Sequence, residues 1–133
     1  MDAALLALTD RGARFTFLGE PFRSRREIPN EDIVDINFSE VEITDADVET
    51  LLPLTHLEGI SFWKTSISDR AIKLIAQLPQ LTRLNLCGTQ VTDDSVPILG
   101  GMALNYIDVA DTQITPHGVE TLRAGLPNAE ILS

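Results

Sequence analysis

The residues of this chain that could act as nucleophile and base are few. There is one cysteine, Cys87, and there are two histidines, His56 and His117. A thiol next to an imidazole can form a nucleophile with its general base. The sequence pattern places Cys87 at the end of a strand and both histidines near helix ends on other sides of the fold. Hydrogen-bond reach between them is not expected, and we predict that the chain is not an enzyme.

Three aspartates recur at one interval and could suggest a ladder of calcium sites. Asp45, Asp69 and Asp93 each follow a serine or threonine at the predicted start of a helix. A carboxylate in the first helical turn is stabilised by the helix dipole, so the pattern has an explanation without metal. The sequence has no paired-histidine metal motif and no glycine-rich phosphate loop. We therefore expect neither a metal nor a cofactor.

A second charged group lies near the start of the chain. Arg23, Arg25 and Arg26 could contact phosphate or an acidic partner, or they could simply be solvated in a loop. The sequence does not decide between these roles.

The charge balance limits the classes of partner. The net charge is −10; residues 1–26 carry +2, whereas residues 27–133 carry −12. Because nucleic-acid binding needs a basic surface, the acidic body argues against a nucleic-acid partner. It favours a basic protein partner through electrostatic steering, although solubility alone would also explain it.

Cysteine usage and hydropathy predict where the protein works. A single cysteine cannot form an internal disulfide, which indicates a reducing compartment. No apolar run approaches about 18 residues, so no membrane span is expected. The first residues, Met-Asp-Ala-Ala, lack the basic start of a signal peptide. We predict a cytoplasmic protein that does not bind a membrane.

The elements that would position these residues follow a pattern that recurs four times. Copies begin at Ile33, Leu57, Leu81 and Leu104, at intervals of 24, 24 and 23 residues, and a fifth begins at Ala129. The first half of each copy alternates apolar and polar residues, as in a strand with one buried face. The second half spaces its apolar residues as in a helix. The pattern predicts strands near 34–38, 58–62, 82–86 and 105–109 and helices near 45–53, 69–78, 93–99 and 116–124.

Helix starts and the N-terminal region are also predicted. Thr44, Ser68, Thr92 and Thr115 are expected N-caps, with a capping box from Thr44 to Asp47. We expect a short helix over residues 2–10, an irregular strand over 14–18 and a loop over 19–31. The chain is thus one domain, 1–133, with a cap at 1–32, units at 33–56, 57–80, 81–103 and 104–128, and a partial unit at 129–133.

The repeated pattern L-x-x-[LI]-x-[LF]-x-x-T-x-[IV]-[TS]-D resembles the leucine-rich repeat proteins of the ribonuclease-inhibitor-like class. It is closest to their bacterial Thr-Asp variant and is similar to the cysteine-containing repeats of F-box-type receptors. The resemblance implies an α/β solenoid, a right-handed horseshoe with a parallel sheet on its concave face and helices outside. It also implies a scaffold that binds proteins on that face. A substrate-receptor subunit of a larger complex is a distant alternative.

The expected binding surface consists of the residues that flank the inward positions of each strand. Three rows result, and they carry the only tryptophan and the only tyrosine of the chain. We expect Ile131 to extend the row of Tyr106, and Ser133 to extend the row of Asp108. Aromatic residues beside arginine are typical interface anchors, although Trp63 could instead cover a neighbour and Tyr106 could stack on Arg83. The predicted partner-binding residues are Asp35, Asn37, Ser61, Trp63, Arg83, Asn85, Tyr106 and Asp108.

Two further expectations concern stacking and the C-terminal edge. Leu84 and Leu86 should be buried in the middle of the stack, and the hydroxyls of Thr65, Thr89 and Thr112 should bond turn backbone and form a ladder between units. The last strand, near residues 129–132, should present an outer edge. Weak homodimerisation through residues 129–133 is therefore the second functional hypothesis, as an assembly or structural element.

Overall fold

The computed structural model describes residues 1–18 and 28–133. The described chain begins with helix α1 (Ala3–Asp10), strand β1 (Arg14–Phe17) and a 3-10 turn, η2 (Asn30–Asp32). Strands and helices then alternate. The remaining elements are β2 (Ile33–Asn37), α2 (Asp45–Val48), η3 (Glu49–Leu51), β3 (Gly59–Ser61), α3 (Asp69–Ile75), β4 (Arg83–Asn85), η4 (Asp93–Ser95), α4 (Val96–Gly100), β5 (Tyr106–Asp108), α5 (Pro116–Gly125) and β6 (Glu130–Leu132).

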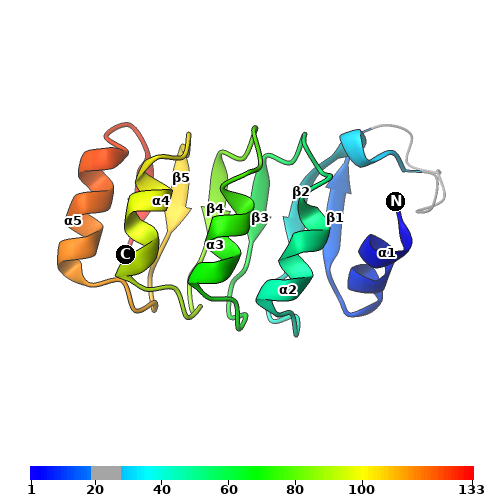
Figure 1. Cartoon of the computed structure of the whole chain (residues 1–133), viewed down its shortest axis with the longest axis horizontal. Coiled ribbons are helices and arrows are strands. Elements are labelled where there is room, and N and C mark those ends of the chain that lie inside the picture. The colour runs from blue at the N-terminus through cyan, green and yellow to red at the C-terminus, as the bar shows by residue number, and fades with distance from the viewer. Residues whose placement is uncertain (19–27) are drawn as a thin grey trace.

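The described strands form one six-stranded sheet whose spatial order is the order of the sequence. Strands β2 to β6 pair in parallel, and β1 pairs with β2 in the antiparallel direction. Helices α1 to α5 lie side by side along the long axis of the molecule and cover one face of the sheet (Figure 1). Within the described residues, no helix covers the other face of the sheet (Figure 1).

This arrangement corrects the predicted fold class. A leucine-rich-repeat solenoid with an all-parallel sheet was expected, whereas the chain is a small α/β fold with a mixed sheet. The difference comes from β1, where Arg14 pairs with Asn37 and Phe15 with Ile36 in the antiparallel direction. Phe15 and Phe17 nevertheless pack against the core, as their alternation predicts.

The positions of the repeated elements are confirmed within the expected margin, with three changes. Four strands and the helical starts at Asp45, Asp69, Asp93 and Pro116 lie where the pattern places them. The predicted helix 45–53 is divided into α2 and the 3-10 turn η3, and the predicted helix 93–99 is divided into the 3-10 turn η4 and α4. The predicted loop 19–31 contains the short turn η2 at its end, and its residues 19–27 lie outside the described chain.

The register of the last strand corrects the predicted surface rows. Tyr106 pairs with Glu130, Ile107 with Ile131 and Asp108 with Leu132. Ile131 therefore points into the core, where it is 9% exposed, and Leu132 is 40% exposed. The fifth copy begins one residue earlier than the apolar spacing suggested, so Ile131 does not lie beside Tyr106 and Ser133 does not lie beside Asp108.

The core consists of continuous rows of inward side chains, one residue from each unit. Leu84 and Leu86 are fully buried, as predicted. Phe38 and Phe62 stack with their ring centroids 5.6 Å apart and 7° between planes. The two rows contributed by the strands are Ile36, Ile60, Leu84, Ile107 and Ile131, and Phe38, Phe62, Leu86 and Val109.

The turn threonines bond turn backbone, as predicted, but they do so within their own units, so the predicted ladder between units is wrong. Thr65 donates its hydroxyl to the carbonyl of Phe62 at 2.9 Å, and Thr89 donates to Leu86 at 2.7 Å. Thr112 donates in the same way to Val109 at 2.6 Å. These bonds close the turn that follows each strand.

The bonds between units come instead from the aspartates at the helix starts. Asp45 accepts the backbone N–H of Ser68 at 2.8 Å and its hydroxyl at 2.6 Å. Asp69 accepts the same two groups of Thr92, at 2.9 and 2.6 Å, and the hydroxyl of Ser95 as well. Asp93 accepts the two groups of Thr115, at 2.8 and 2.6 Å. Each carboxylate thus ties its own helix to the N-cap of the next, and we call these contacts the aspartate bridges.

The first unit is held by a different contact, from the N-terminal cap. Arg11, which follows α1, forms two hydrogen bonds with Asp47 at 3.1 and 2.9 Å. Asp47 also accepts the backbone N–H of Thr44 at 2.8 Å and completes the predicted capping box. The hydrogen bond from Arg11 lowers the pKa of Asp47 below its ordinary value.

We predict that Asp69→Ala lowers the free energy of unfolding by about 1.5–3 kcal/mol at neutral pH, the usual contribution of hydrogen bonds to a charged group. Burial raises the pKa of Asp69, but hydrogen bonds from Ser95 and Thr92 outweigh burial and leave the pKa lowered. A lowered pKa stabilises the fold above the unfolded value, about 3.9, and this stabilisation is lost as pH falls through the folded value. The difference in the free energy of unfolding between wild type and Asp69→Ala should therefore become smaller below about pH 4.

Urea unfolding across pH measures this effect. Asp94→Ala is the matched control, because Asp94 lies next in the sequence to Asp93 but its exposed carboxylate forms no bridge. Equal losses in the two variants, or a difference that does not change with pH, would contradict the role of the bridges.

Candidate functional site

The face of the sheet opposite the helices is the surface that the strands present outward, and we call it the open face (Figure 1). Its first row follows the strand register from Asp35 to Gly59, Arg83, Tyr106 and Glu130. Its second row consists of Asn37, Ser61, Asn85, Asp108 and Leu132, and a third, just after the strands, of Ser39, Trp63, Cys87 and Ala110. The structure thus brings all eight predicted binding residues onto one face.

Several of these side chains also stabilise the strand ends. Asn37 accepts the backbone N–H of Ser39 at 2.8 Å, and Asn85 accepts that of Cys87 at 2.9 Å. Asp108 accepts the N–H of Ala110 at 2.9 Å. Asparagine and aspartate commonly bond backbone two residues on at turns. This row therefore has a structural role that the sequence prediction did not include.

A glycine on the middle strand allows an ion pair to cross three strands. Asp35 and Arg83 flank Gly59 in register, and their side chains meet above it at 3.3 Å. A Cβ at Gly59 would lie 2.3 Å from the Asp35 carboxylate and 3.1 Å from the Arg83 guanidinium. The pair covers a shallow hollow that Tyr106 also lines. Arg83 thus pairs with Asp35, and the alternative in which Tyr106 stacks on Arg83 receives no support.

Trp63 lies partly exposed at the edge of the open face and contacts a cation. The ammonium of Lys64 lies 4.5 Å from the centre of the Trp63 ring. Lys64 occupies a left-handed turn position, with φ of 54°, and its side chain passes close to Gly88, where a Cβ would lie 3.1 Å from Lys64 Cγ. Part of the local packing alternative for Trp63 is therefore observed, while the ring keeps an exposed surface.

The C-terminal half of the open face has a negative electrostatic environment. Burial raises the pKa of Tyr106, and the charges of Asp108 and Glu130 raise it further. Burial also raises the pKa of Cys87, with Asp108 and Asp111 adding to the effect and Trp63 opposing it. Both groups are therefore protonated at neutral pH.

Three residues of this face were missed by the sequence prediction. Glu130 and Leu132 were missed because the last strand was assigned one residue out of register. Counting 24 residues forward from Ile107 to Ile131 would have given the correct register. Lys64 was missed because a turn residue was not considered part of the face.

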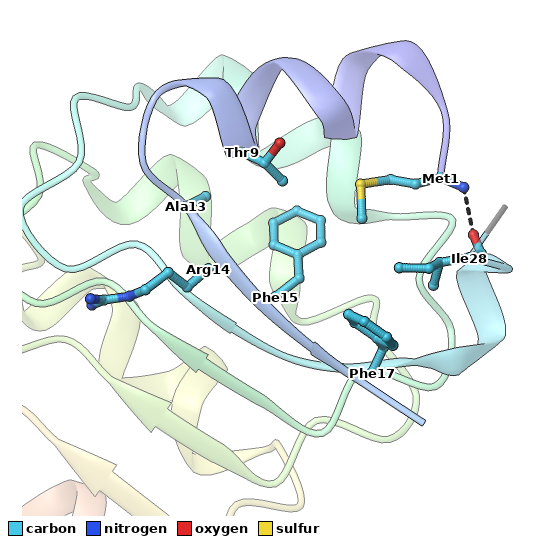
Figure 2. Close-up of a pocket in the computed structure, with 7 residues that line it drawn as sticks. All are labelled: Met1, Thr9, Ala13, Arg14, Phe15, Phe17 and Ile28. Atoms are coloured by element: carbon cyan, nitrogen blue, oxygen red, sulfur yellow. Dashed lines mark hydrogen bonds between the residues drawn. The ribbon is translucent and has the colours of Figure 1, made fainter. Parts of the chain in front are cut away.

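Two further hollows lie at the ends of the molecule, and most of the residues that line each of them are apolar. At the N-terminal end, Phe15 and Phe17 point from β1 toward α1, and Met1 and Ile28 close the space beside them (Figure 2). The amino group of Met1 donates a hydrogen bond to the carbonyl of Ile28 (Figure 2). At the other end, Ile114 and Val119 line a second hollow. Neither hollow gathers polar groups as the open face does.

The alternative chemistries receive no support from the geometry. Hydroxyl and amide hydrogens of the following unit occupy the carboxylates of Asp45, Asp69 and Asp93, which removes the reason to expect calcium there. In the described residues, no three His, Cys, Asp or Glu side chains are grouped to hold a metal. None of the helices in the described ranges is long and apolar enough to cross a bilayer. Arg23, Arg25 and Arg26 lie outside the described chain.

Comparisons with known proteins give little further information. No protein-family model matches the chain, and no curated protein matches it. A similar solved structure is described as the structure of Chaetomium Mex67:Mtr2 subunits; it is 13% identical over 69% of this chain and 77% of that chain, with a TM-score of 0.49. Because no family model and no curated protein match the chain, the resemblance to leucine-rich repeat proteins stays a prediction.

We predict that Cys87 alkylates with a pH midpoint above the ordinary thiol pKa, about 8.5. The variant Asp108→Asn should lower this midpoint, because it removes a charge that raises the Cys87 pKa while its amide oxygen can still accept the Ala110 N–H. The rate of iodoacetamide modification across pH measures the effect, and Cys87 is the only thiol.

Asp94→Asn removes the same charge from the helical side and should leave the midpoint unchanged. An equal shift in both variants would mean that net charge, and not the open face, sets the reactivity of Cys87.

Proposed function

We propose that this chain is a non-catalytic protein-interaction module that binds its partner on the open face of the sheet. The observation that carries the proposal is that Tyr106, on β5, and Trp63, just after β3, lie on the face of the sheet that no described helix covers. They are the only tyrosine and the only tryptophan of the chain. Tryptophan, tyrosine and arginine are the residue types that most often carry the binding energy of protein interfaces.

The chemistry of the face agrees with this function. The middle residue of β3, β4 and β5 is buried in each case, so the core beneath fixes the face. A rigid surface loses little conformational entropy on binding. A single free thiol that stays protonated suits a reducing compartment, and we place the module in the cytoplasm on that ground.

The test is selection of binders from a displayed library of random-sequence peptides on the full chain. Binders of the open face should lose about 2 kcal/mol of affinity, or roughly 30-fold, when Trp63 or Tyr106 is changed to alanine. Thermal stability should change little, because both side chains are only partly buried. Fluorescence anisotropy with synthesised peptides measures the affinities.

Arg70→Ala is the matched control, since Arg70 is exposed on α3, on the helical side. If peptides bind Trp63→Ala and Tyr106→Ala as tightly as wild type but bind Arg70→Ala more weakly, the interaction involves the helices. The proposal that the sheet binds the partner would then be wrong.

Self-association through the C-terminal end is a second candidate, favoured by a specific difference in burial. Ile114 and Val119 are partly exposed, whereas their counterparts in the other three units are 0–4% exposed. Those counterparts are Ile43, Ile67 and Val91 for Ile114, and Val48, Ile72 and Val96 for Val119. A second copy seated on this end would bury both residues.

Sedimentation velocity over a wide concentration range tests self-association. If it occurs, Val119→Arg should shift the protein toward monomer, because the new charge would be desolvated in the contact. The Ile131 charge substitution suggested by the sequence is unsuitable, because Ile131 is buried and its change would unfold the strand. A wild-type protein that stays monomeric at every concentration would exclude this candidate.

A further inference from the structure

The charges of the open face are not balanced along its length. Arg83 is paired with Asp35, and Arg11, which follows α1, is paired with Asp47. Within the described residues, neither Asp108 nor Glu130 forms an ion pair. They lie on adjacent strands, and both raise the pKa of Tyr106, which pairs in register with Glu130 and is two residues from Asp108 on β5.

An exposed apolar side chain lies beside these charges. Leu132 and Glu130 belong to β6 and are two residues apart, so they point to the same face of the sheet. Leu132 is 40% exposed and pairs in register with Asp108. The C-terminal half of the open face thus presents two carboxylates, a phenol and an aliphatic side chain within two strands.

We propose that this half of the open face selects an extended partner segment in which a lysine or arginine is followed, two residues later, by an apolar residue. This inference rests on the proposed function and specifies the chemistry of its partner. The basic side chain would lie between Asp108 and Glu130, where Tyr106 offers an aromatic surface for a cation. The apolar residue would cover Leu132, because side chains two apart in an extended segment share a face.

The charges of the open face oppose binding of an acidic partner segment. Arg83 is the basic residue nearest in register to Tyr106, and its guanidinium already bonds Asp35. An acidic segment would meet Asp108 and Glu130 without compensation, and like charges in contact oppose binding. A basic segment would supply the positive charge that Asp108 and Glu130 lack within the described chain.

The experiment uses the same displayed random-peptide library on the full chain and reads the composition of the binders. Those that require Trp63 or Tyr106 should be enriched in a basic residue with an apolar residue two positions later. On a synthesised binder, Asp108→Asn or Glu130→Gln should each weaken affinity about fivefold, the upper range for an exposed ion pair. Citrulline keeps the shape of arginine without its charge. Replacing the peptide arginine with citrulline should therefore weaken binding to wild type but not to the variant that carries both Asp108→Asn and Glu130→Gln.

The matched control combines Asp94→Asn with Glu120→Gln, which removes two exposed charges from the helical side. Binders that depend on Trp63 but show no basic enrichment, or that respond equally to the control, would overturn this inference and leave the proposed function intact. If no binder depends on Trp63 or Tyr106, both the inference and the proposed function are wrong.

Discussion

The aspartate bridges fix how each strand–helix unit sits on the next. A carboxylate at the first helical residue accepts the N–H and the hydroxyl of the N-cap in the following unit, as Asp69 does with Thr92. The N-cap donors would otherwise be left for water, and the carboxylate keeps its favourable place at the positive end of its own helix. One group therefore serves two helices. In the fourth unit Pro116 occupies the aspartate position, so this contact cannot continue past α5.

The sheet supplies the second constraint, and the two together determine the open face. Backbone bonds between units extend past the strands into the turns, where Glu40 donates to Trp63 at 2.9 Å and Lys64 donates to Cys87 at 2.9 Å. The turn that carries Trp63 is thus held on both sides, through the Trp63 carbonyl toward the first unit and through the Lys64 N–H toward the third. Gly59 has the complementary role: by lacking a Cβ it lets Asp35 and Arg83 approach over the sheet. The absence of a side chain at Gly59 therefore contributes to the shape of the open face.

The sequence predicted the local elements well because periodicity and N-caps are local properties. It predicted the threonine and aspartate contacts poorly, because each residue has a sufficient local explanation. Thr89 could bond within or between units, and Asp69 suits a helix start whether or not a neighbour donates to it. The antiparallel β1 was not predictable, since Phe15 and Phe17 alternate identically in either direction. The one-residue error at Ile131 arose because Ala129 and Leu132 also fit the apolar spacing.

The same contacts limit where binding energy can come from. Asn37, Asn85 and Asp108 each use one side-chain oxygen to accept a backbone N–H just after their strands. Part of their hydrogen-bonding capacity is therefore not available to a partner. Arg83 and Asp35 share one ion-pair contact and are each partly committed to it. What remains uncommitted is the exposed surface of Trp63 and Tyr106, the charge of Glu130 and the second oxygen of Asp108, and the exposed part of Leu132. Because these groups lie mainly toward β5 and β6, the binding energy of the open face should be concentrated in its C-terminal half, with the Asp35–Arg83 pair acting as a polar boundary.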